Sequence, residues 1–232
     1  MSAFAWCAGA LFVLSLGWFL YAYLYRFGRP VTAGPVLPPL FADVLLFSAF
    51  ALHHSLFART PLKAWVRRIA PPPLERAVYT SVASLLFIAV CWLWRPVPGA
   101  LYHIPMPFRW AAYAAQGAGI VLTFLGSRAL DVLDLAGIRA VQRARTGAAA
   151  AHVPLVTSGV FGVVRHPLYF GWALLVCAAP EMTATRAVFA LVSSLYLAIA
   201  IPWEERGLID AFGEEYVGYR RTVRWRMIPF IY

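Results

Sequence analysis

Two clusters of ionisable residues flank apolar segments in the C-terminal third of the sequence. Arg165 and His166 come directly before Pro167 and an apolar run, and Glu204 and Glu205 follow the next apolar run. Guanidinium and imidazole N–H groups bind carboxylates, whereas carboxylates bind ammonium groups and hydroxyls. Together the clusters could bind a small zwitterionic ligand, because ionisable groups at membrane depth are functional candidates. They could equally form interfacial salt bridges that lock two helices together.

The spacing of the two clusters predicts that they meet. Ala184 lies in the short link between the two apolar runs, 18 residues after His166 and 20 residues before Glu204. At 1.5 Å per helical residue each arm is roughly 27–30 Å long, which is about one hydrocarbon thickness. We therefore expect an antiparallel helical hairpin with both clusters at one membrane surface. Pro167 suits the first turn of its helix.

A second group of polar residues lies near the end of an earlier apolar run. His53 and His54 are adjacent, and Arg59 follows about one turn later. Adjacent helical residues point about 100° apart, so only one of these histidines can readily face the centre of a bundle. They are a poor chelating pair, and the three cysteines lie far apart inside apolar runs with no metal or disulfide spacing. The sequence therefore predicts no metal site.

The elements that carry these residues are strongly apolar. Hydrophobic residues make up 62% of the 232 residues and charged residues only 13%, whereas a soluble domain carries about a quarter charged residues. We expect an all-α, polytopic transmembrane bundle of about five or six spans that forms a single domain. Residues 1–127 would supply four N-terminal spans, and residues 128–232 a cytoplasmic loop, the hairpin and a tail. The expected spans are Ala3–Tyr25, Leu37–Phe57, Ala77–Trp94, Trp110–Ser127, Leu168–Pro180 and Ala187–Trp203.

The distribution of positive charge predicts the orientation. The loop after the second span, the loop after the fourth span and the tail each carry five Lys or Arg residues, against five in total on the opposite side. Cytoplasmic loops collect Lys and Arg, so six spans with both termini in the cytoplasm fit this distribution. The net charge of +10 then indicates contact with anionic lipid rather than with nucleic acid. In the tail, Phe212, Tyr216 and Tyr219 share one face of an expected amphipathic helix, and this face would contact either the membrane or the hairpin. We favour a helix that lies on the bilayer surface.

Two smaller features suggest packing roles. The stretch "QGAG", from Gln116 to Gly119, lies inside the fourth span and indicates close packing of helices through small residues. Asp131 and Asp134 are three residues apart just after that span. They could pair with Arg128 or close a ligand pocket, and we favour the pairing.

The hairpin sequence resembles a known superfamily. "RHPLYFG", followed by "EER" and "FGEEYVGYRRTV", is similar to the C-terminal signature of the integral-membrane methyltransferases, which include the isoprenylcysteine carboxyl methyltransferases. The resemblance implies an S-adenosyl-L-methionine pocket built by the hairpin and the preceding loop. The positions that match the signature and would bind the cofactor are Arg165, His166, Pro167, Tyr169, Glu204 and Glu205.

The N-terminal half resembles one group within that superfamily. "LHHSLFART" and "DVLDLAGIRAVQ" are similar to the bacterial methanethiol S-methyltransferases. This implies methyl transfer to a small thiol, from methanethiol to dimethyl sulfide, at the cytoplasmic face of the bacterial inner membrane. A thiolate is the attacking species, so one of His53 and His54, with Arg59, would line the substrate side as catalytic residues. The alternative is that the histidines pack between helices or face the lipid headgroups.

Other functions remain open at this point. The superfamily also implies methylation of an isoprenylcysteine carboxylate or of a phospholipid amine. A different class is a non-catalytic membrane protein that serves respiratory assembly. The sequence predicts no nucleic-acid partner and no particular oligomeric state.

Overall fold

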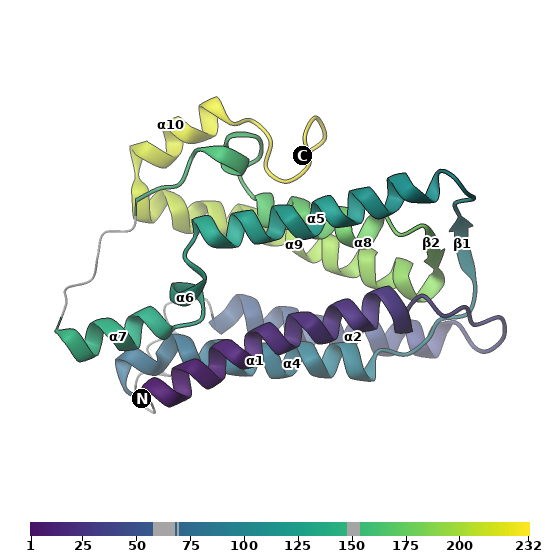
Figure 1. Ribbon diagram of the computed structural model, residues 1–232, viewed down its shortest axis with the longest axis horizontal. Coiled ribbons are helices and arrows are strands. Elements are labelled where there is room, and N and C mark those ends of the chain that lie inside the picture. Colours follow the sequence, from purple (N-terminus) through teal and green to yellow (C-terminus); the bar gives the residue numbers. More distant parts are fainter. Residues whose placement is uncertain (58–67, 69, 148–153) are drawn as a thin grey trace. The chain divides into compact units, whose positions relative to one another are not determined.

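The computed structural model describes residues 1–57, 68, 70–147 and 154–232. These residues are mostly helical, and the chain divides into two compact units (Figure 1). The first unit comprises Met1–Gly99, Asp131–Ala151 and Thr183–Thr185. The second unit comprises Ala100–Leu130, His152–Met182 and Arg186–Tyr232. The all-α membrane bundle expected from composition is therefore confirmed.

In its described part, the first unit is built on three long helices. Helices α1 and α2 both pack against α4, and the π-helical turn η1 continues α1. The short helices α6 and α7 come from the stretch after residue 130, and α7 packs against α1. The bounds are α1 Ser2–Tyr21, η1 Ala22–Arg26, α2 Leu37–Phe57, the 3-10 turn η2 Pro72–Leu74, α4 Glu75–Leu93, α6 Val132–Leu135 and α7 Ile138–Thr146.

Small residues bring the later segment of the first unit close to the earlier helices. Ala5, Ala8 and Ala77 form a buried cluster with Ile138. Gly137 has a φ of +81°, and a Cβ there would lie 2.7 Å from the backbone nitrogen of Ala77. A side chain at residue 137 would therefore clash with the start of α4 as well as strain the backbone.

The second unit contains the predicted hairpin. Helix α5 packs along α8, and two short strands, β1 and β2, pair with each other (Figure 1). The sequence did not predict these strands, because each is only three or four residues long and lies in a link between apolar runs. The bounds are β1 Ala100–His103, α5 Arg109–Ala129, the 3-10 turn η3 Gly159–Gly162, α8 Pro167–Cys177, β2 Glu181–Thr183, α9 Ala184–Phe212 and α10 Glu214–Thr222.

Glycines account for the close approach of α5 and α8. A Cβ at Gly119 would lie 2.5 Å from the carbonyl oxygen of Gly171, and a Cβ at Gly171 would lie 2.6 Å from the carbonyl oxygen of Gly119. The Gln116 side chain donates to the Leu175 carbonyl at 2.9 Å. The interpretation of "QGAG" as a small-residue packing surface is confirmed.

Six helices occur where the sequence predicted six spans. Among the residues that the structure describes, four helical stretches are long and apolar enough to cross a membrane: Ser2–Arg26, Leu37–Ser55, Pro72–Leu93 and Ala184–Phe212. Helix α8 is a shorter apolar helix, and α5 contains Gln116 and several small residues that lower its hydropathy. The chain is therefore a helical membrane protein.

The end of α9 differs from the prediction. The helix continues to Phe212, nine residues beyond the expected end at Trp203, so both glutamates lie inside it. Leu208, Ile209 and Phe212 extend the helix because they pack against Tyr216 and Tyr219 of α10.

The expected surface helix of the tail is also wrong in one respect. Gly213, with a φ of +55°, breaks it into the end of α9 and a separate α10. Tyr216 and Tyr219 are 1% and 7% exposed. They pack against Leu208, Ile209 and Phe212 of α9, so they face the hairpin, which is the other predicted orientation, and not the bilayer.

Candidate functional site

The Arg-His-Pro sequence forms the start of α8. His166 is the N-cap of the helix and Pro167 is its first helical residue. Proline suits this first position, because a backbone N–H there would have no partner within the helix. The backbone N–H groups of Arg165 and His166 donate to the carbonyls of Trp225 and Arg226, at 2.9 and 2.8 Å. The loop after α10 thus fixes the backbone that carries both side chains.

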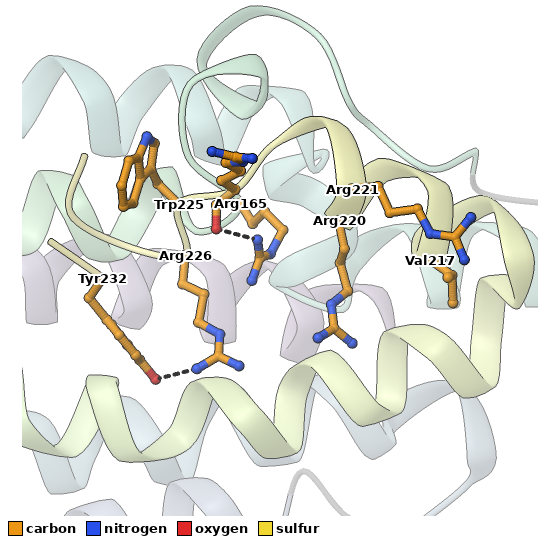
Figure 2. A pocket seen from close by; sticks show the side chains of 8 residues that line it. Arg165, Val217, Arg220, Arg221, Trp225, Arg226 and Tyr232 are labelled. Atoms are coloured by element: carbon orange, nitrogen blue, oxygen red, sulfur yellow. Dashed lines mark hydrogen bonds between the residues drawn. The ribbon is translucent and has the colours of Figure 1, made fainter. Parts of the chain in front are cut away.

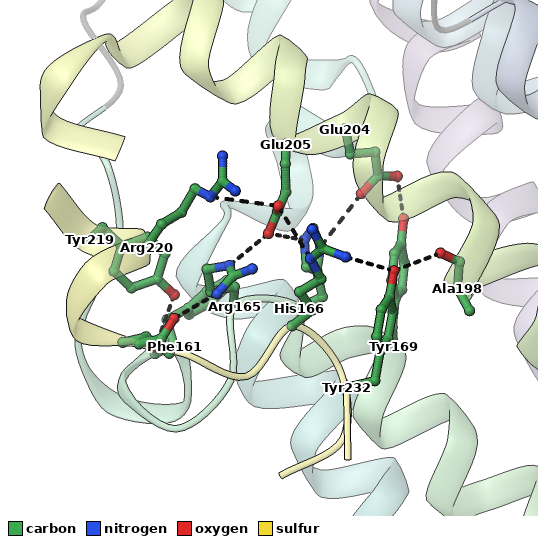
Figure 3. Close-up of polar contacts among 12 residues, drawn as sticks. Phe161, Arg165, His166, Tyr169, Ala198, Glu204, Glu205, Tyr219, Arg220 and Tyr232 are labelled. Atoms are coloured by element: carbon green, nitrogen blue, oxygen red, sulfur yellow. Dashed lines mark hydrogen bonds and ion pairs between the residues drawn. The ribbon is translucent and has the colours of Figure 1, made fainter. Parts of the chain in front are cut away.

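Arg165 and Glu205 form a buried ion pair. Arg165 Nε donates to Glu205 Oε1 at 2.6 Å, and the two side chains are 4% and 3% exposed. Arg165 Nη1 also donates to the carbonyls of Val223 and Arg224, at 2.7 and 2.8 Å. Figure 3 shows the pair within a larger polar network. The sequence prediction that the two clusters meet is confirmed.

Glu204 lies in a more open setting than Glu205. Its side chain is 43% exposed, and Oε2 is 3.5 Å from His166 Nδ1. The Tyr169 hydroxyl donates to Glu204 Oε1, and the Tyr169 ring stacks on the His166 ring with centroids 5.4 Å apart. Adjacent glutamates therefore have different roles in the structure: one is neutralised by a buried guanidinium, and the other accepts from a phenol and remains accessible.

Further side chains from the tail complete the network. Arg226 Nε and Arg220 Nε lie 3.5 and 3.7 Å from Glu205 Oε2. Arg226 also donates to the Tyr232 hydroxyl at 3.1 Å, and that hydroxyl donates to the Ala198 carbonyl at 3.2 Å (Figure 3). Sequence reasoning missed Arg220, Arg226 and Tyr232 as site residues. The only signal was the density of arginine and aromatic residues in the tail.

Two buried polar atoms of this network are unsatisfied. His166 Nε2 lies 3.7 Å from Glu205 Oε1, which is an ion-pair contact but beyond hydrogen-bond distance. Within the described residues, neither this atom nor the Tyr216 hydroxyl has a hydrogen-bond partner. Such groups are rare because an unpaired buried donor costs about 1–3 kcal/mol. Burial, and then the nearby Glu205 carboxylate, raise the pKa of Tyr216 well above its usual range, so this phenol is a neutral donor. Both atoms are suited to contact a bound ligand.

Tyr219 anchors the other side of the network. Its hydroxyl donates to the Phe161 carbonyl at 2.7 Å, which ties α10 to η3. Burial raises the pKa of Tyr219 to about 12, so this side chain is also neutral under ordinary conditions.

A cavity of about 640 Å³ lies beside the network. Figure 2 shows the guanidinium groups of Arg165, Arg220 and Arg226 pointing toward one space. The lining residues are Arg165, Val217, Arg220, Arg221, Arg224, Trp225, Arg226 and Tyr232.

The two histidines proposed for the thiol belong to the first unit. His54 Nδ1 is 2.8 Å from the Tyr79 hydroxyl, and the rings of His53 and His54 both pack on the Tyr79 ring, with centroids 6.0 and 5.7 Å apart. Arg59 lies outside the described residues. In the part of the chain that the structure describes, no three His, Cys, Asp or Glu side chains are grouped so that they could hold a metal ion.

The two aspartates after α5 form ion pairs, but with other partners than predicted. Asp131 accepts from Arg139 at 2.9 Å. Asp134 accepts from Arg143 at 2.6 Å and also pairs with Arg76. Arg128 instead lies over the Phe124 ring, 5.8 Å from its centroid. The chain turns after α5 at Asp131, whose φ is +58°, so the aspartates point to the following helix and to α4.

Comparison with known proteins finds several relatives that share one name. A methanethiol S-methyltransferase of Crocosphaera subtropica is 35% identical over 193 residues, which cover 83% of this chain and 75% of that protein. Methanethiol S-methyltransferase 2 of Bradyrhizobium diazoefficiens is 33% identical over 84% of this chain and 74% of its own.

A third relative carries the same name. The methanethiol S-methyltransferase of Mycobacterium tuberculosis is 31% identical over 82% of this chain and 79% of its own. No protein-family model matches the chain, and no solved structure matches it significantly. The matches cover most of both chains, and the protein belongs to the methanethiol S-methyltransferase family of membrane proteins.

Proposed function

We propose that the protein transfers a methyl group from S-adenosyl-L-methionine to a small thiol, converting methanethiol to dimethyl sulfide. The observation that carries this proposal is the polar network of the hairpin. A buried Arg165–Glu205 pair lies beside the accessible Glu204 and the unsatisfied His166 Nε2. The family relationship supplies the reaction and the acceptor named for the relatives.

The residues of the network fit the cofactor's functional groups. S-adenosyl-L-methionine carries an ammonium, a carboxylate, ribose hydroxyls and a sulfonium, and its net charge is positive. Glu204 would bind the ammonium or a ribose hydroxyl. His166 Nε2 and the Tyr216 hydroxyl would donate to the carboxylate or to hydroxyl oxygens, and the Tyr169 ring suits a neighbouring cation.

Arg165, Pro167 and Glu205 would act by positioning. Pro167 starts α8 directly after His166. The three hydrogen bonds of Arg165 connect the start of α8 to α9 and to the loop after α10. When bound, the cofactor supplies an electrophilic methyl group on a sulfonium. The protein must then hold the thiol sulfur about 3–3.5 Å from that carbon and in line with the leaving group.

The thiol must also lose a proton. A thiolate attacks far faster than a thiol, and a nearby imidazole or guanidinium favours the thiolate. We assign this role to one of His53 and His54, with Arg59 as a supporting cation. We also propose that both termini and the reaction lie at the cytoplasmic face of the bacterial inner membrane. The excess of basic residues in the loops and tail supports this orientation, because cytoplasmic loops collect Lys and Arg.

The test is transfer of labelled methyl from S-adenosyl-L-methionine to a panel of acceptors by the purified full chain in detergent. The panel contains methanethiol, longer alkyl thiols, an isoprenylcysteine and phosphatidylethanolamine. We expect volatile labelled dimethyl sulfide as the main product. Label found only in the isoprenylcysteine ester or in the lipid would overturn the acceptor, and binding of the cofactor without transfer to any acceptor would overturn the thiol reaction.

A further inference from the structure

The arginine-lined cavity carries far more positive charge than its surroundings neutralise. Five guanidinium groups line it, and Glu205 is the single carboxylate that pairs with any of them among the described residues. Arg221 and Arg224 form no ion pair within that part of the chain and are both exposed. Like charges this close repel one another, so a bound anion would stabilise the arrangement.

The cofactor does not suit this cavity. Its ammonium and sulfonium outweigh its single carboxylate, so a cavity with an excess of guanidinium groups would repel it. Glu204 does not line the cavity and is contacted by Tyr169 and His166 instead, and Glu205 is already paired with Arg165. The cavity therefore fits a second, anionic ligand.

Exposed apolar side chains at the edge of the cavity indicate what kind of anion this is. Trp225 lines the cavity, and its ring contacts the Phe230 ring with centroids 5.4 Å apart. Phe230 and Ile231 are 84% and 77% exposed. A water-soluble phosphate compound would gain nothing from these side chains, whereas a lipid would cover them with its acyl chains.

We propose that this cavity binds the phosphate of an anionic phospholipid. Arg220, Arg221 and Arg224 would contact the headgroup, and Phe230 and Ile231 would enter the acyl region. Aromatic residues beside basic ones are typical of the boundary between headgroups and hydrocarbon. The proposal concerns lipid binding alone and does not depend on the methyl acceptor or on the cofactor.

Lipid binding is measured by native mass spectrometry of the purified full chain in a non-ionic detergent, titrated with phosphatidylglycerol or with phosphatidylcholine. We expect phosphatidylglycerol to bind at least about tenfold more tightly. The double variant Arg221→Gln/Arg224→Gln should weaken phosphatidylglycerol binding about 20-fold or more, since each basic residue near an anionic headgroup contributes roughly fivefold. Binding of phosphatidylcholine should be unchanged.

A matched control distinguishes the loss of cavity arginines from the loss of positive charge elsewhere on the protein. Arg206 is exposed on α9 and does not line the cavity, so Arg206→Gln should leave lipid binding unchanged. Equal affinity for the two lipids, or an equal loss in Arg206→Gln and the double variant, would overturn the proposal. Displacement of phosphatidylglycerol by inorganic phosphate at equal concentration would also overturn it and would indicate a site for free anions.

A measurement on the wild type keeps the proposal testable if the double variant does not fold. Raising the salt concentration from 50 to 500 mM should weaken phosphatidylglycerol binding severalfold and leave phosphatidylcholine binding unaffected, because exposed charges are screened. Insensitivity of phosphatidylglycerol binding to salt would contradict an electrostatic headgroup site.

Discussion

Glu204 and Glu205 are adjacent in sequence, yet their environments differ in a way that only the side-chain contacts explain. Glu205 accepts from Arg165 in the protein interior, and Glu204 accepts from Tyr169 at an accessible position. Removing one member of a buried ion pair leaves the other charge uncompensated. At the residue scale, the Glu205 carboxylate maintains the site and the Glu204 carboxylate is available to a ligand.

Substitution of the two glutamates should separate stability from ligand binding. We expect Glu205→Gln to lower the free energy of unfolding by about 3–5 kcal/mol. Glu204→Gln should change stability by less than about 1 kcal/mol, because the contact is partly exposed. Denaturant unfolding in detergent, followed by tryptophan fluorescence, measures both. Equal destabilisation by the two variants would contradict the assignment.

The histidines of α2 can be tested one at a time. If one of them favours the thiolate, its replacement by alanine should lower thiol turnover near neutral pH about 100-fold or more. The loss should shrink as the pH approaches the pKa of the thiol itself, and the other variant should resemble the wild type. The measurement is turnover against pH at saturating cofactor.

Tyr79 provides the control for this experiment. Tyr79→Phe removes the hydroxyl that contacts His54 but keeps the ring on which both histidines pack. If His53→Ala and His54→Ala both retain wild-type turnover and pH dependence, the histidines only pack and the proposed role is wrong.

Tyr219 should make the protein sensitive to alkali. Its pKa is 10.0 when unperturbed and about 12 in the folded protein, so between these values the unfolded chain loses a proton that the folded chain retains. The contribution of Tyr219 to stability should therefore be constant below pH 10 and fall as the pH rises toward 12. Tyr219→Phe should show a shallower fall, measured as the free energy of unfolding from pH 8 to 12. An unchanged slope in the variant would contradict the assignment.

At the scale of elements, glycines determine how closely α5 and α8 approach. Gly119→Ala and Gly171→Ala should each destabilise the second unit by about 1–3 kcal/mol, because the added Cβ would meet backbone atoms at 2.5 and 2.6 Å. Gly117→Ala is the matched control, since a Cβ there meets nothing within 4 Å; it should be neutral or slightly stabilising. Thermal unfolding of the three variants distinguishes them. Equal melting temperatures would show that the helices can separate without cost.

The sequence predicted the helices well and their ends less well. Long apolar runs place α1, α2, α4 and α5 within a few residues, because crossing a bilayer requires about 20 apolar residues. The extension of α9 to Phe212 depends on tertiary packing against Tyr216 and Tyr219. Hydropathy falls after Trp203, so the pattern alone gives no reason for the helix to continue.

The candidate site was also predicted in part. Counting residues along the hairpin was sufficient to bring Arg165 and His166 to Glu204 and Glu205. Arg220 and Arg226 reach Glu205 only because the chain turns at Gly213, with its positive φ, and because the loop after α10 runs back to Arg165 and His166. No periodicity in the sequence encodes that return.

At the scale of the whole molecule, the chain forms two units from interleaved stretches of sequence. The stretch Asp131–Ala151 belongs with the first 99 residues, where Asp134 pairs with Arg76 and Gly137 packs on Ala77. The hairpin, α5 and the tail form the second unit. The network around the Arg165–Glu205 pair and the arginine-lined cavity lie within the second unit, and His53 and His54 lie within the first.

The central claim is that the hairpin network binds the methyl donor for transfer to a thiol. The most direct measurement is the initial rate of labelled dimethyl sulfide formation from labelled S-adenosyl-L-methionine and methanethiol, by wild type, Glu204→Gln and Arg206→Gln. We expect label in dimethyl sulfide from the wild type and from Arg206→Gln. Glu204→Gln should lose about 10- to 100-fold at limiting cofactor, the range for a hydrogen bond to a charged group. A rate for Glu204→Gln equal to that of the wild type, or no label on the thiol from folded wild type, would contradict the account.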